Sequence, residues 1–269
     1  MSISGVPGCL AHPGALPEGS AAMSGNGLDH DGHGRGLGSV LSGLAVAVGC
    51  VLFLGGFAWG AVQYKPYTVP TQSMSPTVKA GDRVLAQRIS GGDVRRGDVV
   101  VFTDKTWSNM PMVKRVVGIG GDVVKCCGTD GKLTVNGQPV DEPYLHGKTP
   151  ASASPFDAKV PQGQVFLLGD DRYVSLDSRV HLDDTANGSV PLSAVSARVD
   201  AIAWPMDGML GRPSGFEAMP GGISQPGPLK LVLGAVVAGV VLILAGAAYG
   251  PIAGLARRRR ARAASPAGR

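Results

Sequence analysis

Two long runs of uncharged, apolar residues limit this chain more than any other feature of its sequence. They are Val40–Val62 and Leu231–Gly250, and neither contains a charged residue. As α-helices they would be ~35 Å and ~30 Å long, enough to cross a hydrocarbon layer of ~30 Å. We therefore expect two membrane-spanning helices, one toward each end of the chain.

The alternative for the first run is a secretory signal sequence that is cleaved off. A typical signal sequence has an apolar stretch of ~7 to 15 residues behind a basic flank. Val40–Val62 is longer, and the flank before it holds Arg35 together with the acidic residues Glu18, Asp29 and Asp31. The pattern therefore favours a retained span.

The charge distribution predicts the topology. The formal net charge of +5 could by itself suit a nucleic-acid partner. Much of the excess, however, lies behind the second run, in Arg257, Arg258, Arg259, Arg260 and Arg262. Basic residues beside a span stay in the cytoplasm and meet anionic lipid, so we expect a bilayer as partner, no nucleic acid, and both termini inside.

This topology divides the chain into five expected parts. They are a disordered cytoplasmic tail (1–38), a transmembrane helix (39–62), an extracytoplasmic domain with a flexible C-terminal tether (63–228), a second transmembrane helix (229–252) and a basic cytoplasmic tail (253–269).

The region between the two runs has the pattern of a mainly β domain without a long amphipathic helix. Asn136-Gly137 suits a hairpin turn, because both residues tolerate positive φ. Lys148–Asp157 and Pro205–Pro228 are rich in Pro, Gly and Ser, which predicts a surface loop and the tether. Short runs rich in Val and Ile, bounded by Gly, Asp and Pro, predict strands at Arg83–Ile89, Val99–Thr103, Met112–Ile119, Val123–Cys126, Leu133–Val135, Val165–Leu168 and Val195–Trp204.

Cys126 and Cys127 are the only cysteines in the expected exported domain. Adjacent Cα atoms across a trans peptide lie ~3.8 Å apart, which is closer than the usual ~4.4 to 6.8 Å of a disulfide. We therefore expect two reduced thiols on opposite faces of a strand rather than a vicinal bridge. No second Cys or His pair has the spacing of metal ligands, so we expect neither a metal nor another cofactor.

Four segments in the middle of the chain carry residues suited to chemistry. They are "PTQSMSPTVKAGD" (Pro70–Asp82), "RRGDVVVF" (Arg95–Phe102), "MVKRVVGIGGDVV" (Met112–Val124) and "GDDRYVSLDSR" (Gly169–Arg179). In this order, behind an apolar span, they resemble the type I signal peptidases of the bacterial Ser-Lys kind, from about Tyr67 to Pro205. The resemblance implies a signal-peptidase-like β domain, of the kind shared with repressor proteases, anchored here by two transmembrane helices.

The residues support this chemistry independently of the resemblance. A serine hydroxyl is a weak nucleophile unless a base takes its proton, and a neutral lysine amine can be that base. In an extended "MVKRVVGI", Lys114 shares a face with Met112 and Val116. An apolar face lowers the pKa of a lysine, whereas Arg115 points the other way and stays protonated.

The resemblance assigns Ser73 as the nucleophile and Lys114 as its general base. Thr71, two residues before the nucleophile, would form the oxyanion hole with the Ser73 backbone N–H, and Met74 would line the substrate pocket. The plain alternative for a serine in a Pro-flanked turn is a turn residue. The lysine strand and the later segment favour catalysis instead.

The segment "GDDRYVSLDSR" is implied to support the base. Ser175 would hydrogen-bond the lysine amine, and Asp177 and Arg179 would form a structural ion pair, with Arg115 as a further candidate partner.

Other polar residues in and beside this segment have a simpler explanation. For Asp170, Asp171 and Arg172 a solvated run of charge is a serious alternative, and His181 is expected at the surface.

Together these features imply a membrane-bound serine endopeptidase that removes signal peptides from exported preproteins. It would cleave after small residues, commonly Ala at the first and third positions before the bond, through an acyl-enzyme. Two alternatives remain open. One is a self-cleaving repressor-type peptidase, which would need a DNA-binding module and no spans. The other is a membrane-anchored β module that only binds.

Overall fold

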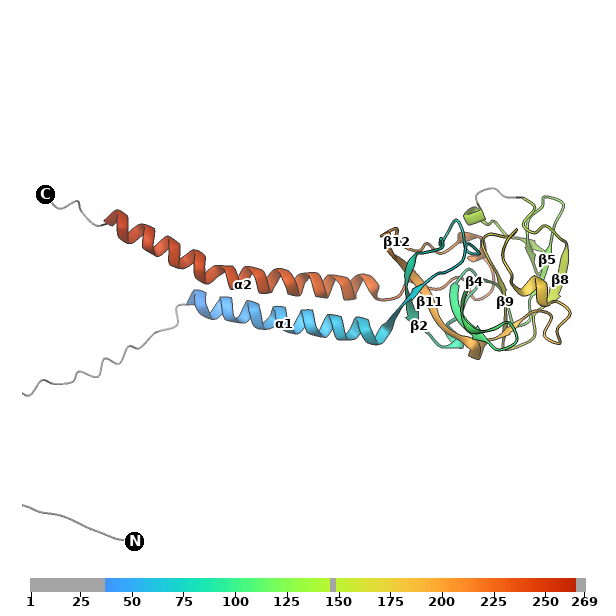
Figure 1. The fold of residues 1–269 in the computed structure, drawn as a ribbon, viewed down its shortest axis with the longest axis horizontal. Coiled ribbons are helices and arrows are strands. Elements are labelled where there is room, and N and C mark those ends of the chain that lie inside the picture. The colour runs from blue at the N-terminus through green and yellow to red at the C-terminus, as the bar shows by residue number, and fades with distance from the viewer. Residues whose placement is uncertain (1–36, 146–148, 265–269) are drawn as a thin grey trace, which may run out of the picture.

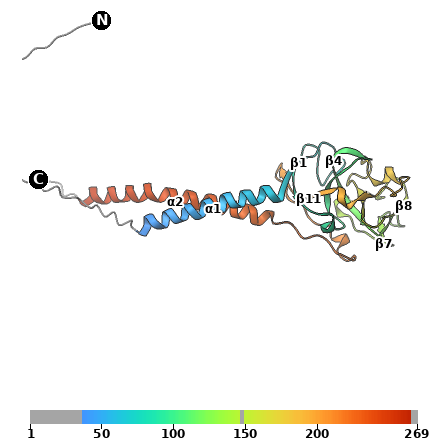
Figure 2. The same ribbon diagram turned by 90° about the horizontal axis from the view of Figure 1, so that it is seen from below.

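The structure is a computed structural model that describes residues 37–145 and 149–264. Two long helices, α1 (Leu37–Gln63) and α2 (Leu229–Ala264), lie side by side and lead to one β-rich domain (Figures 1 and 2). The expectations for residues 1–36 and 265–269 fall outside the described part of the chain. A mainly β domain carrying two long helices confirms the predicted fold class.

The β domain is built from two antiparallel sheets. The larger has the order β1-β2-β11-β3-β4-β9-β10, with β12 added beside β11, and the smaller has the order β7-β6-β5-β8. The larger sheet lies next to the helices and the smaller at the far end of the domain (Figures 1 and 2). The strands are β1 (Tyr64–Thr68), β2 (Arg83–Arg88), β3 (Val99–Asp104), β4 (Ser108–Ile119), β5 (Val123–Cys126), β6 (Thr134–Val135), β7 (Gln138–Pro139), β8 (Phe156–Lys159), β9 (Gln164–Leu168), β10 (Val190–Pro191), β11 (Val195–Trp204) and β12 (Gly208–Met209).

The predicted strands all occur, because each is an apolar run that ends at a residue suited to turns. β5 and β11 have the predicted bounds, and the others have one end shifted. Asn136 and Gly137 turn the hairpin between β6 and β7 with φ values of 53° and 79°. The strands that the sequence does not predict are short, and several of them lie at sheet edges, where few side chains are buried and the alternating pattern is weak.

Both α-helices are long and apolar enough to cross a membrane. They approach each other through small residues, which let two helix backbones lie close together. Gly49 and Gly56 are the buried residues of α1, and Ser42 Oγ donates a hydrogen bond of 2.7 Å to the Gly246 carbonyl of α2. α2 continues past the expected end of the span, through Pro251, to Ala264.

The segment Pro205–Pro228 corrects the expectation of a flexible tether. Phe216 is fully buried and Met219 nearly so, and both belong to the apolar core beneath the smaller sheet. Ser224 Oγ donates a hydrogen bond to the buried carboxylate of Asp98. The many prolines and glycines prevent regular structure, but the apolar side chains between them still pack, so the segment is docked on the domain.

Two further expectations are wrong. The predicted surface loop at Lys148–Asp157 is partly core: Lys148 lies outside the described residues, but Ala151 is buried and β8 begins at Phe156. Cys126 and Cys127 form a vicinal disulfide across a cis peptide bond, with Cα atoms 2.9 Å apart. The expectation of two reduced thiols rested on a trans peptide bond.

Docking of the C-terminal segment makes a testable prediction. Phe216→Ala should lower the free energy of unfolding by about 3 to 5 kcal/mol, because it empties a fully buried aromatic site. Chemical unfolding of the full chain in detergent, followed by tryptophan fluorescence, measures this. Val180→Ala, at a side chain that is 57% exposed, serves as the control and should change little. If Phe216→Ala were as stable as Val180→Ala, the segment Pro205–Pro228 would not be docked through Phe216, and a flexible tether would be the better description.

Candidate active site

Ser73 lies on the loop between β1 and β2. Backbone hydrogen bonds join the two ends of this loop, and a buried side chain anchors its middle in the core. Val69 N–H donates to the Asp82 carbonyl at 2.9 Å, and Gly81 N–H donates to the Val69 carbonyl at 2.8 Å. Met74 is fully buried in the core that includes Val69. With Met74 pointing inward, the Ser73 hydroxyl is held at the outer side of a rigid loop.

Lys114 reaches Ser73 from β4, a central strand of the larger sheet. It pairs with Val100 of β3 and is only 5% exposed. Its Nζ donates a hydrogen bond of 2.7 Å to Ser73 Oγ. Burial lowers the pKa of the Lys114 amine; the Asp177 and Asp170 carboxylates oppose this fall and Arg179 reinforces it. The structure thus brings together the two residues that the sequence predicts as nucleophile and base.

An elongated groove of about 700 Å³ runs past this pair. Most of its wall is apolar, and the serine and lysine lie on it. The lining residues are Tyr67–Ser73, Val101, Ser108, Met110–Lys114, Val174 and Leu176. The predicted pocket residue Met74 is not among them. It belongs to the core because the loop turns at this point, so that Met74 and Val78, joined by a hydrogen bond from Val78 N–H to the Met74 carbonyl, are both buried.

Thr71 and Ser175 lie beside the pair, but only Thr71 contacts it. Thr71 Oγ1 is 3.2 Å from Ser73 Oγ, and either oxygen can be the donor. The implied hydrogen bond from Ser175 to Lys114 is absent, since Ser175 Oγ is buried without a hydrogen-bond partner among the described residues.

Gly169 explains how the loop of Ser175 can lie against the nucleophile loop. A Cβ atom at this position would collide with the Ser175 side chain and the Ser73 carbonyl. That carbonyl also accepts a hydrogen bond of 3.1 Å from Asp171 N–H. The close approach therefore requires glycine at the end of β9. In the sequence, the only sign of this close approach is that a glycine follows a predicted strand.

The predicted Asp177–Arg179 pair is present. Arg179 Nε and Asp177 Oδ1 are 2.8 Å apart, and Asp177 Oδ2 accepts from Gly169 N–H at 3.0 Å. This ion pair therefore ties the loop after β9 back to the end of that strand.

Arg115 supports the same loop through a partner that the sequence leaves open. Its guanidinium binds Asp170 with two hydrogen bonds, of 2.8 Å and 2.6 Å, and both side chains are buried. Asp170 is therefore not part of a solvated charge run. Arg115 lies on β4 and Asp170 lies just after the neighbouring strand β9, so the two residues are far apart in the sequence.

Arg172 and Glu142 form a second buried ion pair that the sequence does not predict. Arg172 Nε also donates to the Gly169 carbonyl at 3.0 Å. Tyr144 donates its hydroxyl hydrogen bond to Glu142, and the Arg115 guanidinium lies 3.8 Å from the centre of its ring. Arg172 is thus structural rather than solvated, and Glu142 and Tyr144 are supporting residues without a local sequence signal.

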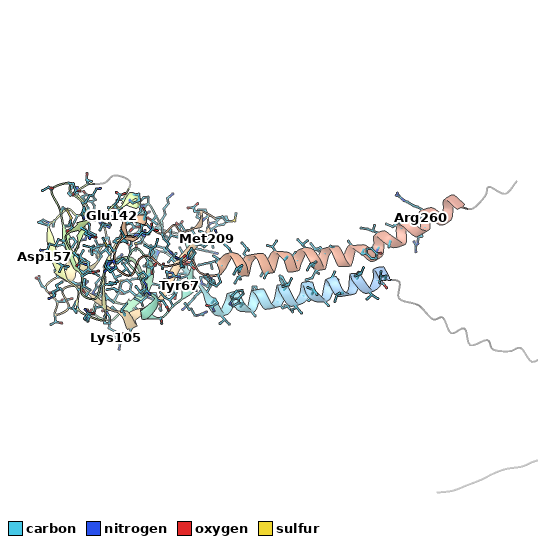
Figure 3. All side chains as sticks on the ribbon, turned by 180° about the vertical axis from the view of Figure 1, so that it is seen from behind. Tyr67, Lys105, Glu142, Asp157, Met209 and Arg260 are labelled. Carbon is cyan, nitrogen blue, oxygen red and sulfur yellow. A yellow bond between two sulfur atoms is a disulfide. The ribbon has the colours of Figure 1, made fainter. Side chains whose placement is uncertain are left out.

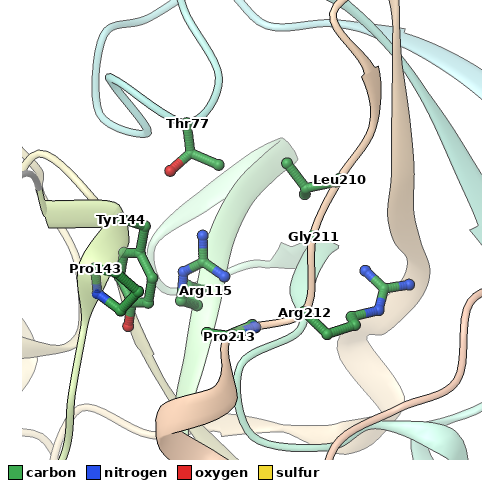
Figure 4. A pocket seen from close by; sticks show the side chains of 8 residues that line it. All are labelled: Thr77, Arg115, Pro143, Tyr144, Leu210, Gly211, Arg212 and Pro213. Carbon is green, nitrogen blue, oxygen red and sulfur yellow. The ribbon is translucent and has the colours of Figure 1, made fainter.

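A smaller cavity of about 250 Å³ lies on the far side of this network (Figure 4). Arg115 and Tyr144 form one wall, Thr77 of the nucleophile loop another, and Leu210 and Arg212 of the C-terminal segment a third. No group of three or more His, Cys, Asp or Glu residues that could hold a metal occurs in 37–145 and 149–264. His181 is partly buried, where it stacks on Trp107 rather than standing free at the surface.

Fold and site together describe a mainly β protein in which a buried lysine amine contacts a serine hydroxyl beside an apolar groove. Residues 40–204 match the family described as signal peptidase, peptidase S26. The chain belongs to this family.

Two relatives illustrate the similarity. Signal peptidase I of Mycobacterium tuberculosis H37Rv is 32% identical over 192 residues, which cover 52% of this chain and 65% of that protein. Signal peptidase IB of Staphylococcus aureus N315 is 33% identical over 180 residues, covering 60% of this chain and 87% of the relative. A crystal structure of a signal peptidase I from Enterococcus faecalis V583 aligns with a TM-score of 0.31 and 25% identity, covering 44% of this chain and 97% of that one.

The charges around Lys114 make a prediction about its ionisation. Arg179→Gln removes a positive charge and leaves the Asp177 carboxylate without its partner, so the pKa of Lys114 should rise. NMR titration of lysines labelled at Cε, assigned with Lys114→Arg, measures this pKa in the full chain. Arg95→Gln, at an arginine whose guanidinium donates to the Gly92 and Val94 carbonyls and does not act on the Lys114 pKa, is the control. An unchanged or lower pKa in Arg179→Gln would contradict the argument.

Proposed function

We propose that this chain is a membrane-bound serine endopeptidase that removes N-terminal signal peptides from exported preproteins. The observation that carries the proposal is the 2.7 Å contact between the Lys114 amine and the Ser73 hydroxyl, in a chain of the signal peptidase family. A buried amine with a lowered pKa can accept the serine proton at moderate pH, which an exposed lysine cannot.

The proposed reaction uses the groups already in contact. Ser73 Oγ attacks the scissile carbonyl as its proton passes to Lys114 Nζ, and the protonated amine then gives that proton to the leaving nitrogen. The Thr71 hydroxyl and the Ser73 N–H stabilise the oxyanion. A water molecule, deprotonated by Lys114, then hydrolyses the acyl-enzyme.

The groove supports an extended peptide as substrate. Its two long walls are Tyr67–Ser73 and Met110–Lys114, and β1, which enters the first wall, is an edge strand with unpaired backbone groups on one side. An extended peptide can pair with such a strand. The apolar walls suit uncharged side chains next to the cut bond, and cleavage after Ala-x-Ala sequences is part of this proposal.

The proposed function also includes a position for the catalytic domain at the membrane. The two helices would hold the catalytic domain against the outer face of the membrane, with both termini in the cytoplasm and the exposed arginines Arg258–Arg260 of α2 among anionic headgroups. Preproteins would then meet the site while their signal segment is still in the bilayer.

Removing either member of the pair should abolish cleavage. We expect Ser73→Ala and Lys114→Ala each to lower the rate by on the order of 10³-fold or more, because the two groups act as one unit. The assay is processing of a preprotein by the full chain in vesicles, followed by N-terminal sequencing of the product. Lys79→Ala, at an exposed lysine of the nucleophile loop, is the control. Cleavage that survives in either variant, or is absent from the unaltered chain, would refute the assignment.

The pH dependence should report the same amine. Only neutral Lys114 can accept a proton, so kcat/KM should fall as the pH drops through its lowered pKa and level off above it. Initial rates with a soluble peptide across a pH series test this. In Arg179→Gln the rise should move to higher pH, in step with the pKa measured by NMR. A flat profile would exclude Lys114 as the base.

A further inference from the structure

The end of the domain nearest the helices contains buried polar groups that the proposed reaction does not use. Asp200 of β11 is fully buried and lies in the midst of them. Tyr67 and Met209 mark this end in Figure 3, and Asp157 marks the opposite one. Buried carboxylates are costly unless they are paired, so this cluster requires a structural or functional reason.

Asp200 connects the two chain segments that lead into the helices. The hydroxyl of Tyr64, the first residue after α1, donates to Asp200 Oδ2 at 3.1 Å. The backbone N–H of Gly227, two residues before α2, donates to the same oxygen at 3.1 Å. Arg198 and Arg212 balance the carboxylate charge.

Gly227 shows how closely these segments are fitted. A Cβ atom there would collide with the Asp200 carboxylate, the Tyr64 hydroxyl and the Gln87 side chain. No larger residue can therefore take this place without moving the junction.

Arg88 fixes the direction of α1 itself. From the end of β2, its guanidinium donates hydrogen bonds to the carbonyls of Val62, at 2.6 Å, and Ala61, at 3.0 Å. These carbonyls belong to the last turn of the helix, which has no intrahelical donors for them. A positive charge at a helix C-terminus also interacts favourably with the helix dipole. The helix axis is thus tied to the larger sheet.

The nucleophile is connected to this junction without a flexible link. α1 ends at Gln63, β1 begins at Tyr64, and the loop after β1 carries Ser73. The five residues of β1 span ~17 Å in extended form. A tilt of the junction would therefore be transmitted to Ser73 through one strand and its loop.

We propose that this junction, formed by Tyr64, Arg88, Asp200 and Gly227, sets the height of Ser73 above the bilayer and thereby selects which peptide bond of a membrane-embedded substrate is cut. The proposal rests on the proposed peptidase function. An extended substrate advances ~3.4 Å per residue, so a change in height of that size shifts the cut by one residue. These four residues are positioning residues, since none of them lines the groove that contains Ser73 and Lys114.

Two substrates separate this role from catalysis. The first is a preprotein in vesicles whose apolar segment is followed by two identical Ala-x-Ala sites, four residues apart. The second is a soluble peptide with one such site, which needs no bilayer. Mass spectrometry gives the ratio of the two products from the first substrate, and initial rates are measured with the second.

Tyr64→Phe and Arg88→Met each remove side-chain hydrogen bonds of the junction and leave the buried charge pairs intact. We expect each to change the product ratio by about threefold or more, because each loses hydrogen bonds that hold the junction. The rate with the soluble peptide should stay within about twofold. Arg83→Met, at an exposed arginine on the opposite end of β2, is the control and should preserve both readouts.

The outcomes are distinguishable. A shifted product ratio with an unchanged peptide rate supports the proposal. An unchanged product ratio in both variants overturns the proposal. Equal cutting at both sites by the unaltered chain also overturns it. In either case the peptidase function still stands. A parallel loss of both activities also overturns it, because it indicates general destabilisation. If the unaltered chain cuts neither substrate, the proposed function itself fails and this inference falls with it.

Discussion

The arrangement around Ser73 depends on lowering the pKa of the Lys114 amine that contacts its hydroxyl. Burial achieves this only if nearby carboxylates do not restore the ammonium form, and two of them, Asp170 and Asp177, lie within electrostatic range. Each is neutralised by its own arginine, Arg115 or Arg179. The ion pairs around the site fix the loop after β9, and Arg179 also offsets part of the rise in the pKa of the amine that the two carboxylates cause.

Much of the fold and part of the site could be predicted because they leave local signals. Apolar runs that end at Gly, Asp and Pro give the strands, and length with lack of charge gives the helices. Lys114 is recognisable because its strand is apolar, and Asp177 and Arg179 are close enough in sequence to suggest a pair. Ser73 needs the family resemblance, since a serine in a polar turn has no distinctive local pattern.

The remaining features depend on contacts between distant segments. Nothing near Asp170 indicates that Arg115 will neutralise it, so solvation is a reasonable expectation for the aspartate. The inward direction of Met74 follows from the path of one loop, which composition does not fix. The docking of Phe216 is hidden by the prolines and glycines around it, because these residues prevent helices and strands but do not prevent burial.

The place of Phe216 in the chain also affects how the domain can form. Strands beneath which its ring packs, such as β9, are complete well before residue 216 has been synthesised. A growing chain therefore has a gap in the core that both sheets share until the segment just before α2 arrives. This last piece of the core lies directly before α2, so the domain reaches its full packing only once the segment before the second helix has been added.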